Sequence, residues 1–373
     1  MKRVLVVFGT RPEAIKMAAL VKQLSQQSEL DFRVCCTAQH REMLDQVLDL
    51  FDIEPDFDLD LMSDGQDLTD ITSKILLSLR GVFEQYLPDI VLVHGDTTTT
   101  FATSLAAFYH RIPVGHVEAG LRTGDMLSPW PEEGNRVLTG RIADSHFAPT
   151  DLARANLLNE NIASENILVT GNTVIDALLM TVRKLETQKF DVRSIAGLQQ
   201  LDVNRKMILV TCHRRESFGE GINNVCNALR QIATDFPDIQ IVYPVHLNPN
   251  IRAPAFKFLD GIENVFLLEP QEYLPFVALM KASHLILTDS GGIQEEAPAL
   301  SKPVLVMRQV SERQEAIEAG TVKLVGTDAQ DIITEVSELL NSEDRYLAMA
   351  ETKNPYGNGT ASQQIIDFLR KNL

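Results

Sequence analysis

A glycine turn between an apolar run and an expected helix is the clearest candidate binding site in the chain. The run 284–288 is followed by Asp289-Ser290-Gly291-Gly292, and a helix is expected from Ile293 to Leu300. Glycine lets a backbone approach a ligand closely, and a helix start offers unpaired N–H groups at the positive end of its dipole. The pattern favours a phosphate site, with Glu296 placed to accept hydrogen bonds from sugar hydroxyls. An ordinary capped helix would give the same local pattern.

Cationic side chains that suit a diphosphate follow other apolar runs. His213-Arg214-Arg215 comes directly after one such run, and Arg11 and Arg313 are single candidates of the same kind. Arg binds phosphate through paired N–H donors, so the cluster favours diphosphate binding. The alternative is a surface salt bridge, for example with Glu216.

Three carboxylates, Asp96, Glu118 and Glu132, are candidates for acid–base chemistry on a sugar. Each alone could equally be a helix cap or a salt-bridge partner. His246 is as readily a packed histidine as a ligand. The chain has neither Gly-x-Gly-x-x-Gly, nor a phosphate loop, nor a Cys/His metal spacing, so we expect no dinucleotide and no metal.

The elements that must position these residues alternate between strand and helix. Thr10 and Glu13 fit a capping box for a helix that ends near Leu24. The strands are expected at 4–8, 32–37, 89–96, 113–118 and 167–170, then at 206–211, 239–243, 265–268, 284–288 and 304–307. This alternation predicts α/β units with parallel sheets, in which ligands bind beyond the carboxyl ends of strands. We expect two units facing each other across a cleft, with 188–205 as a linker or surface excursion.

Composition narrows the classes of partner. The 373 residues are 45% apolar and 23% charged, with a net charge of -17 that argues against nucleic acid or an acidic membrane surface. No apolar run approaches the roughly 20 residues that span a bilayer, so no membrane insertion is expected. The four cysteines show no pairing pattern, which suggests reduced thiols and a cytoplasmic location.

The motifs taken together resemble the bacterial non-hydrolysing UDP-N-acetylglucosamine 2-epimerases. The resemblance covers essentially the whole chain and rests on 9–14, 93–97, 115–123, 131–133, 213–216, 289–296 and 354–357. It implies a GT-B fold, with one Rossmann-like domain at 1–171 joined by a final helix at 360–373, and another at 172–359. It also implies reversible conversion of UDP-GlcNAc to UDP-ManNAc without a cofactor, for surface polysaccharides, by a homodimer.

The resemblance also assigns roles to individual residues. The catalytic residues would be Asp96, Glu118, Glu132 and His213. The nucleotide pocket would comprise Arg11, Lys16, Gln271, Phe276, Ser290, Gly291, Gly292, Glu296 and Arg313. A second site, where UDP-GlcNAc acts as activator, would comprise Gln39, Glu42, Gln66, Arg214 and His246. Three positions depart from the family pattern, namely Cys212, Gly134 and Gln314.

The chemistry of C2 inversion fits this residue set. The C2 proton is not next to a carbonyl, so the enzyme must either oxidise C3 with NAD or eliminate UDP to form 2-acetamidoglucal and then add UDP back. The second route needs a stabilised diphosphate, carboxylates for the two faces and a cleft that retains the intermediate. Two alternatives use the same nucleotide pocket: a GT-B glycosyltransferase, which does not need three carboxylates, and a non-catalytic nucleotide-sugar sensor.

Overall fold

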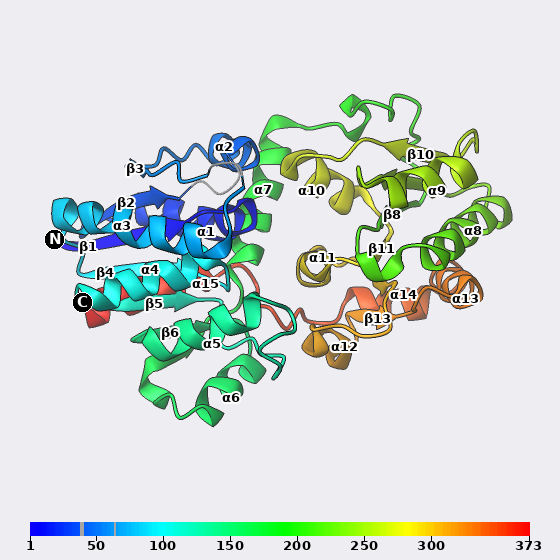
Figure 1. Cartoon of the computed structure of the whole chain (residues 1–373). Helices are drawn as coiled ribbons and strands as arrows, with labels where there is room; N and C mark the ends of the chain where they lie inside the picture. The colour runs from blue at the N-terminus through cyan, green and yellow to red at the C-terminus, as the bar shows by residue number, and fades with distance from the viewer. Residues whose placement is uncertain (38–40, 63–64) are drawn as a thin grey trace. The chain divides into compact units, whose positions relative to one another are not determined.

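The computed structural model describes residues 1–37, 41–62 and 65–373, and the chain forms two compact units (Figure 1). Unit 1 comprises Met1–Leu179 and Tyr356–Leu373, and unit 2 comprises Met180–Pro355. The division falls inside helix α7 (Thr173–Gln188), whereas the sequence suggested a boundary after residue 171. No helix among these residues is long and apolar enough to cross a membrane.

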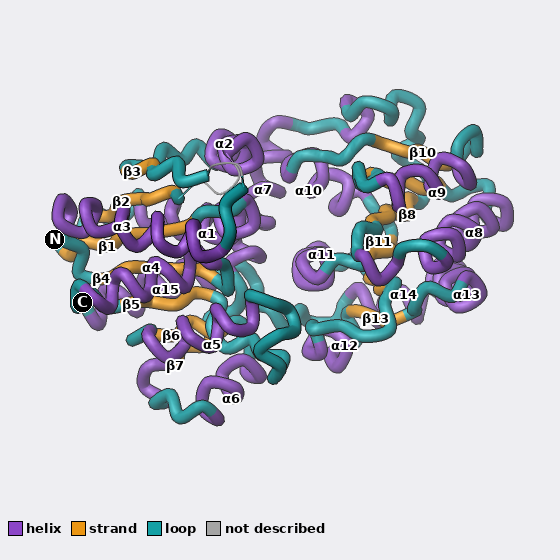
Figure 2. The backbone as a smooth tube through the Cα atoms, in the orientation of Figure 1, coloured by secondary structure: helices purple, strands orange, loops and turns teal. Residues whose placement is uncertain are grey.

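Unit 1 is built on a seven-stranded parallel sheet in the order β3-β2-β1-β4-β5-β6-β7. The strands are β1 (Lys2–Phe8), β2 (Leu30–Cys36), β3 (Phe57–Asp58), β4 (Ile90–His94), β5 (Val114–Val117), β6 (Ser145–Ala148) and β7 (Ile167–Val169). The helices besides α7 are α1 (Arg11–Leu24), α2 (Arg41–Leu50), α3 (Leu68–Tyr86), α4 (Thr98–Tyr109), α5 (Glu132–Ile142), α6 (Asp151–Asn159) and α15 (Ala361–Asn372), with a short η1 (Ser164–Asn166). Strands and helices alternate along the chain, as expected (Figure 2).

Unit 2 has a six-stranded parallel sheet in the order β10-β9-β8-β11-β12-β13. The strands are β8 (Met207–Thr211), β9 (Gln240–Pro244), β10 (Val265–Leu268), β11 (Leu285–Thr288), β12 (Val304–Val306) and β13 (Val322–Leu324). The α-helices are α8 (Glu220–Asp235), α9 (Pro249–Leu259), α10 (Tyr273–Ala282), α11 (Gly291–Glu296), α12 (Gln314–Ala319), α13 (Ala329–Asn341) and α14 (Glu343–Ala350). The 3-10 helices are η2 (Val192–Ser194), η3 (Arg215–Ser217) and η4 (Ala297–Leu300).

The strand order places a topological switch point in each sheet. β1 lies between β2 and β4, and β8 lies between β9 and β11, so successive connections leave the central strand in opposite directions. Ligands of doubly wound sheets bind beyond the carboxyl ends of the strands at this point. The turns there begin at Gly9 and Gly95 in unit 1, and at Cys212 and Asp289 in unit 2.

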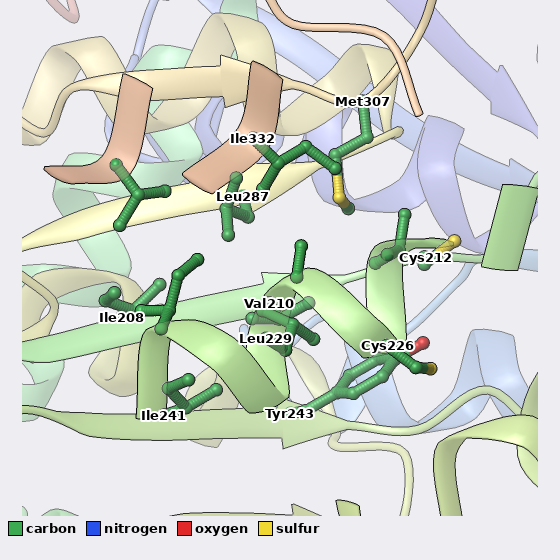
Figure 3. Packing of buried hydrophobic residues seen from close by; sticks show 14 of the residues in the cluster. Ile208, Val210, Cys212, Cys226, Leu229, Ile241, Tyr243, Leu287, Met307 and Ile332 are labelled. Carbon is green, nitrogen blue, oxygen red and sulfur yellow. The ribbon is translucent and has the colours of Figure 1, made fainter. Parts of the chain in front are cut away.

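Apolar packing holds the switch-point strands rigidly. In unit 2, Val210 and Leu287 on adjacent strands are fully buried and pack with Leu229 of α8 (Figure 3). In unit 1 all five residues of β4 are buried. Burial on both faces explains why these strands are apolar at successive positions.

The carboxyl-terminal helix α15 belongs to unit 1. Ile365, Ile366 and Leu369 are fully buried, and the ring of Phe368 packs edge-to-face on Phe147 of β6 at 5.3 Å between centroids. The backbone at the start of α15 is anchored to α7, because Asp176 accepts hydrogen bonds from the N–H groups that begin the helix.

The segment 189–206 is not only a linker. It carries little regular structure beyond η2, but it buries Ile195, Leu198 and Leu201 in unit 2. The segment as a whole is polar and poorly periodic, which is why the pattern suggested a linker or surface excursion.

Candidate active site

Glu118 is a buried carboxylate of unit 1. It follows β5 with a φ of 63°, a conformation that costs a non-glycine residue about 1–3 kcal/mol and is concentrated at functional sites. Its Oε2 forms an ion pair with Lys16 of α1 and accepts a hydrogen bond from Asn172 Nδ2 at 2.7 Å. Both contacts hold the carboxylate in one orientation.

The buried His94 lies close to the same oxygen of Glu118. His94 Nε2 is 3.8 Å from Glu118 Oε2. Burial lowers the pKa of His94 to about 4, although the nearby Glu118 acts in the opposite direction. His94 is therefore neutral near pH 7, and the positive charge beside Glu118 comes from Lys16. The sequence assigned Lys16 to the nucleotide pocket, whereas the structure shows it against this carboxylate.

Asp96 is linked to two further residues of helix α5. Arg136 forms an ion pair with Asp96 and also contacts Glu133 Oε2 at 3.1 Å. Asn135 donates to the Asp96 carbonyl at 2.9 Å. These contacts fix the turn after β4 to the start of α5.

Glu132, the third predicted carboxylate, is less buried than its neighbour Glu133. Glu132 is half-buried at the first position of α5. Glu133 is buried, and its Oε1 accepts the N–H groups of Thr123 and Gly124 at 3.0 and 3.1 Å. Glu133 therefore ties the start of α5 to the loop at Thr123 and Gly124, and Glu132 is the residue that precedes it in α5.

The turn after β1 is held by a buried carboxylate rather than by its arginine. Glu13 accepts from the N–H of Gly9 and Thr10 at 3.1 and 2.8 Å, and from the hydroxyl of Thr97 at 2.6 Å. Burial raises the pKa of Glu13 despite these hydrogen bonds. Arg11 is exposed at the first position of α1. The predicted capping box is confirmed, and it ties the turn after β1 to the turn after β4.

In unit 2, His213 is held by a buried aspartate. His213 Nδ1 lies 2.9 Å from Asp289 Oδ1, and the N–H groups of His213 and Arg214 donate to Asp289 Oδ2 at 2.7 and 2.8 Å. The pairing of Thr211 with Thr288 brings the two turns together. Asp289 was part of the sequence motif but was not assigned a role.

Two residues predicted for the second site lie next to His213. The ring of His246 is 6.1 Å from the ring of His213, centroid to centroid. Arg214 Nη2 lies 3.5 Å from Glu312 Oε1, and Glu312 also pairs with Arg308 at 2.7 Å. Unit 2 therefore brings together His213, Arg214 and His246.

The remaining residues predicted for the second site belong to unit 1. Gln39 lies outside the described residues. Glu42 is on α2, but its side chain is also outside the description. Gln66 is half-buried and donates to the carbonyl of Leu61 at 2.9 Å.

The glycine turn starts a helix, as the sequence predicts, but the helix is shorter. Ser290 occupies the N-cap position of α11 without a side-chain capping hydrogen bond, and the chain continues as η4, which ends at Leu300. A Cβ on Gly291 would lie 2.8 Å from Glu312 Oε1, whereas one on Gly292 would meet nothing closer than 3.8 Å. A Cβ at Gly291 would therefore displace the end of the Glu312 side chain, whereas one at Gly292 would displace nothing.

Arg313 is fastened to this short helix. It forms an ion pair with the buried Glu295, and its N–H donates to Ser311 Oγ at 3.0 Å. Ser311 in turn donates to Gln294 Oε1 at 2.6 Å. The loop after β12 is thereby held against α11.

The other predicted pocket residues of unit 2 lie around α10. Tyr273 OH donates to Glu296 Oε1 at 2.7 Å, and burial raises the pKa of Tyr273 well above its usual value. Gln271 and Phe276 are half-buried, and Gln271 Nε2 donates to the Glu269 carbonyl at 2.7 Å.

Sequence reasoning missed the residues that support the predicted ones. The main examples are Asn172, Glu133, Arg136 and Asp289. Asp289 is the first residue after β11, and Asn172 is the third residue after β7; a position just after a strand was the available signal. Among the described residues no three His, Cys, Asp or Glu side chains are arranged to hold a metal ion.

The sequence matches a known family over almost its whole length. The model of the UDP-N-acetylglucosamine 2-epimerase family matches residues 22–370. The chain is 60% identical over 371 residues to the UDP-N-acetylglucosamine 2-epimerase of Escherichia coli strain K12, covering 99% of each protein. This chain belongs to the UDP-N-acetylglucosamine 2-epimerase family.

Solved structures of the UDP-N-acetylglucosamine 2-epimerase family share the fold. The Neisseria meningitidis enzyme bound to UDP-GlcNAc matches with a TM-score of 0.90 at 54% identity, over 99% of this chain and 100% of that chain. The Methanocaldococcus jannaschii enzyme in complex with UDP-GlcNAc and UDP matches with a TM-score of 0.80 at 34% identity, over 100% of both chains. The predicted α/β fold of GT-B type, with two Rossmann-like units, is confirmed. The chain is an isomerase that epimerises UDP-GlcNAc at C2.

Proposed function

We propose that the chain interconverts UDP-GlcNAc and UDP-ManNAc by eliminating UDP and adding it back. Unit 1 supplies the carboxylates for the C2 proton, and unit 2 supplies the groups for the diphosphate. The observation that carries the proposal is the environment of Glu118, because Lys16 and Asn172 hold its carboxylate in a fixed orientation at the carboxyl end of β5. A positioned carboxylate at a strand end is what proton removal from a sugar carbon needs.

The elimination step follows from this division. A carboxylate takes the C2 proton, the C2–H electrons form the C1=C2 bond, and the C1–O electrons leave with the diphosphate. The products are 2-acetamidoglucal and UDP, and readdition delivers a proton to the opposite face of C2. We assign the proton transfers to Asp96, Glu118 and Glu132 together, without dividing the two faces among them.

Stabilisation of the diphosphate is assigned to unit 2. His213 is presented by Asp289, and Arg313 is fixed by Glu295 beside the turn Ser290-Gly291-Gly292. Preorganised donors of this kind stabilise charge that develops as a leaving group departs. The room around Gly292 supports a close approach of a phosphate to the backbone.

The hydroxyl-binding part of the pocket is assigned to Glu296. Its carboxylate is buried and already accepts a hydrogen bond from Tyr273. Gln271 and Phe276 complete the proposed nucleotide pocket of unit 2, and Arg11 and Lys16 are the proposed contributions of unit 1.

We infer that UDP-GlcNAc also acts as an activator and that the enzyme works as a cytoplasmic homodimer. The proximity of Arg214 and His246 to His213 supports an effector site beside the diphosphate. Initial rates should then be sigmoidal in UDP-GlcNAc, and UDP-ManNAc alone should react slowly until UDP-GlcNAc is added. His246→Ala should weaken this activation more than it weakens UDP binding. Hyperbolic rates that ignore added UDP-GlcNAc would exclude the effector site.

Deuterium incorporation tests the reaction itself. The enzyme is incubated with UDP-GlcNAc in deuterated water, without NAD or metal, and C2 is observed by NMR. We expect UDP-ManNAc with deuterium at C2, and traces of UDP and 2-acetamidoglucal. A product that keeps its original C2 hydrogen would refute the elimination route, and Glu118→Gln provides a control for background exchange.

A further inference from the structure

Asp289 holds both the backbone and the ring of His213. It is fully buried directly after β11, and it meets the turn after β8 through the three contacts of 2.7 to 2.9 Å described above. Its own N–H donates to the carbonyl of Thr211 at 3.3 Å. Two of these contacts fix the backbone of the turn, and the third pairs the His213 ring with Asp289.

The charge on Asp289 needs a cationic partner. Burial by itself would raise the pKa of Asp289, but the hydrogen bond and charge of His213 and the two backbone N–H groups outweigh it and hold the pKa below its usual value. A buried carboxylate without a cation is costly, and breaking such a pair is strongly destabilising.

The other ionisable groups facing the pair do not replace His213. They are the thiol of Cys212, the phenol of Tyr243, the guanidinium of Arg214 and the ring of His246. Burial raises the pKa of both the thiol and the phenol, so each is neutral near pH 7. Figure 3 shows Cys212 and Tyr243 among the packed apolar side chains of unit 2. The Arg214 guanidinium pairs with Glu312.

The geometry restricts how His213 can act. Nδ1 is paired with Asp289 Oδ1 at 2.9 Å, which leaves Nε2 as the ring nitrogen for a ligand, and the side chain is 39% exposed. In the neutral ring with Nδ1–H, Nε2 carries a lone pair that would repel a phosphate oxygen. Only the imidazolium donates from both nitrogens at once.

We propose that Asp289 is a positioning residue that keeps His213 as an imidazolium with its Nε2–H presented to the diphosphate of the substrate. The inference rests on the proposed function, because the diphosphate is the group that receives the hydrogen bond. As the C1–O bond breaks, its electron pair moves to the diphosphate oxygen, and a charge-assisted hydrogen bond to that anion strengthens. The step transfers no proton to or from Asp289.

Asp289→Asn in the full-length enzyme tests this role. The amide oxygen still accepts backbone N–H groups, but the substitution removes the charge that stabilises the imidazolium. We expect kcat to fall about 10²-fold with a smaller change in KM, and its decline on the alkaline side to begin at lower pH. Asp289→Glu should recover part of the rate.

Asp176→Asn is the matched control. Asp176 is also a buried aspartate that accepts two backbone N–H groups, in its case Ala361 and Ser362, but it faces no histidine ring. We expect a loss of thermal stability with an unchanged pH profile of kcat. If Asp289→Asn shows only that pattern, Asp289 is structural and the inference is overturned.

The ring of His213 can be observed directly. NMR of ¹⁵N-histidine enzyme, assigned with His213→Asn, should show that deprotonation leaves the Nδ1–H tautomer, and that Asp289→Asn moves the titration midpoint to lower pH. An Nε2–H tautomer in the unmodified enzyme would overturn the inference even if Asp289→Asn did not fold.

The two proposals fail separately. An enzyme that does not turn over UDP-GlcNAc would refute the proposed function, whereas the ring tautomer and midpoint would still report on the pair. Normal turnover with an unmoved pH profile and midpoint in Asp289→Asn would refute only the inference.

Discussion

Two of the three proposed catalytic carboxylates, Glu118 and Asp96, each form an ion pair with a cation of unit 1. Lys16 pairs with Glu118, and Arg136 pairs with Asp96. The cation orients the carboxylate, as the proposed proton transfer from C2 requires. An amide at the same position keeps the shape but cannot accept that proton.

The variants Asp96→Asn, Glu118→Gln and Glu132→Gln should therefore lose turnover. Positioned acid–base groups contribute about 10²–10⁴-fold, and we expect kcat to fall within that range. UDP affinity, measured by calorimetry, should change little, because most of the assigned UDP residues lie in unit 2. Glu84→Gln, on the exposed face of α3, is the control. Near-normal rates in all three variants would leave these residues with a structural role only.

Arg136 should be energetically coupled to Asp96. Arg136→Met removes the cation that orients Asp96 and also leaves Glu133 without that partner, so we expect kcat to fall about 10-fold or more. The double variant with Asp96→Asn should be less impaired than the product of the single losses, because both changes break one interaction. Independent, multiplicative effects in this kinetic cycle would show that Arg136 does not act through Asp96.

At the scale of elements, the turn after β1 leaves no space for a side chain. A Cβ on Gly9 would lie 2.1 Å from Thr37 Oγ1 and 2.5 Å from Thr99 Oγ1. Two hydroxyls that hydrogen-bond to each other at 3.0 Å fill this space, so both would have to move.

Gly9→Ala should destabilise the fold by about 1–3 kcal/mol, the usual cost of overpacking. Gly81→Ala is the matched control, because Gly81 is exposed within α3 and a Cβ there meets nothing within 4 Å. We expect the control to stabilise by about 0.5–1 kcal/mol through helix propensity. Denaturant unfolding measures both, and equal effects would contradict the packing argument.

The elements with strong local signals were predictable from the sequence. The capping box at Thr10 and Glu13 and the end of α1 at Leu24 were predicted and are present. β6 (Ser145–Ala148) was not predicted, because its sequence Ser-His-Phe-Ala has no apolar run. His146 is buried in a strand that lies between β5 and β7, and the sequence does not show that position. The 3-10 ending of the helix after Gly292 was also missed, although Pro298 marked its limit.

The sequence predicted which candidate residues follow strands, but it did not predict which of them pair with one another. Lys16 and Glu118 are 102 residues apart, and His213 and Asp289 are 76 residues apart. Their meeting depends on strand order, with β1 beside β4 and β8 beside β11, which no local pattern specifies. The sequence therefore identified residues that follow strands, and the sheets determine which of them touch.

At the scale of the whole molecule, the buried histidines are unevenly distributed. Unit 1 holds His94, His116 and His146, whose pKa values burial lowers to about 4, 3 and 4. In the described part of unit 2, burial lowers the pKa of His284 to about 4. Each histidine is neutral in the folded unit and takes up a proton more readily when unfolded.

Acidification should therefore destabilise unit 1 more than unit 2. The stability from a depressed histidine is fully present above its unfolded pKa of about 6.5, and it is lost as the pH falls toward the folded value. Each contributes at most about 1.4 kcal/mol per pH unit within that window. Hydrogen exchange, followed in peptides of each unit between pH 7 and 5, should show the larger loss of protection in unit 1. Equal losses would contradict this distribution.

The return of the chain to unit 1 at Tyr356 also fixes an order of events during synthesis. Residues 356–373 complete unit 1, and they are made after the whole of unit 2. Domains generally fold as units while the chain emerges, amino-terminal parts first. Here residues 1–179 emerge first but cannot complete unit 1 until residues 356–373 are made, whereas all residues of unit 2 are made before that point.

Glu118, the carboxylate proposed for proton transfer, shares this delay. The N–H of Asn172 donates to the carbonyl of Tyr356 at 2.8 Å, and the side chain of Asn172 donates to Glu118. A nascent chain that has not yet reached Tyr356 therefore lacks the hydrogen bond that fixes Asn172, and Asn172 is the residue that orients Glu118. Proton-transfer geometry is among the last features to be assembled, so prematurely terminated chains carry a formed unit 2 without a finished proton-transfer site.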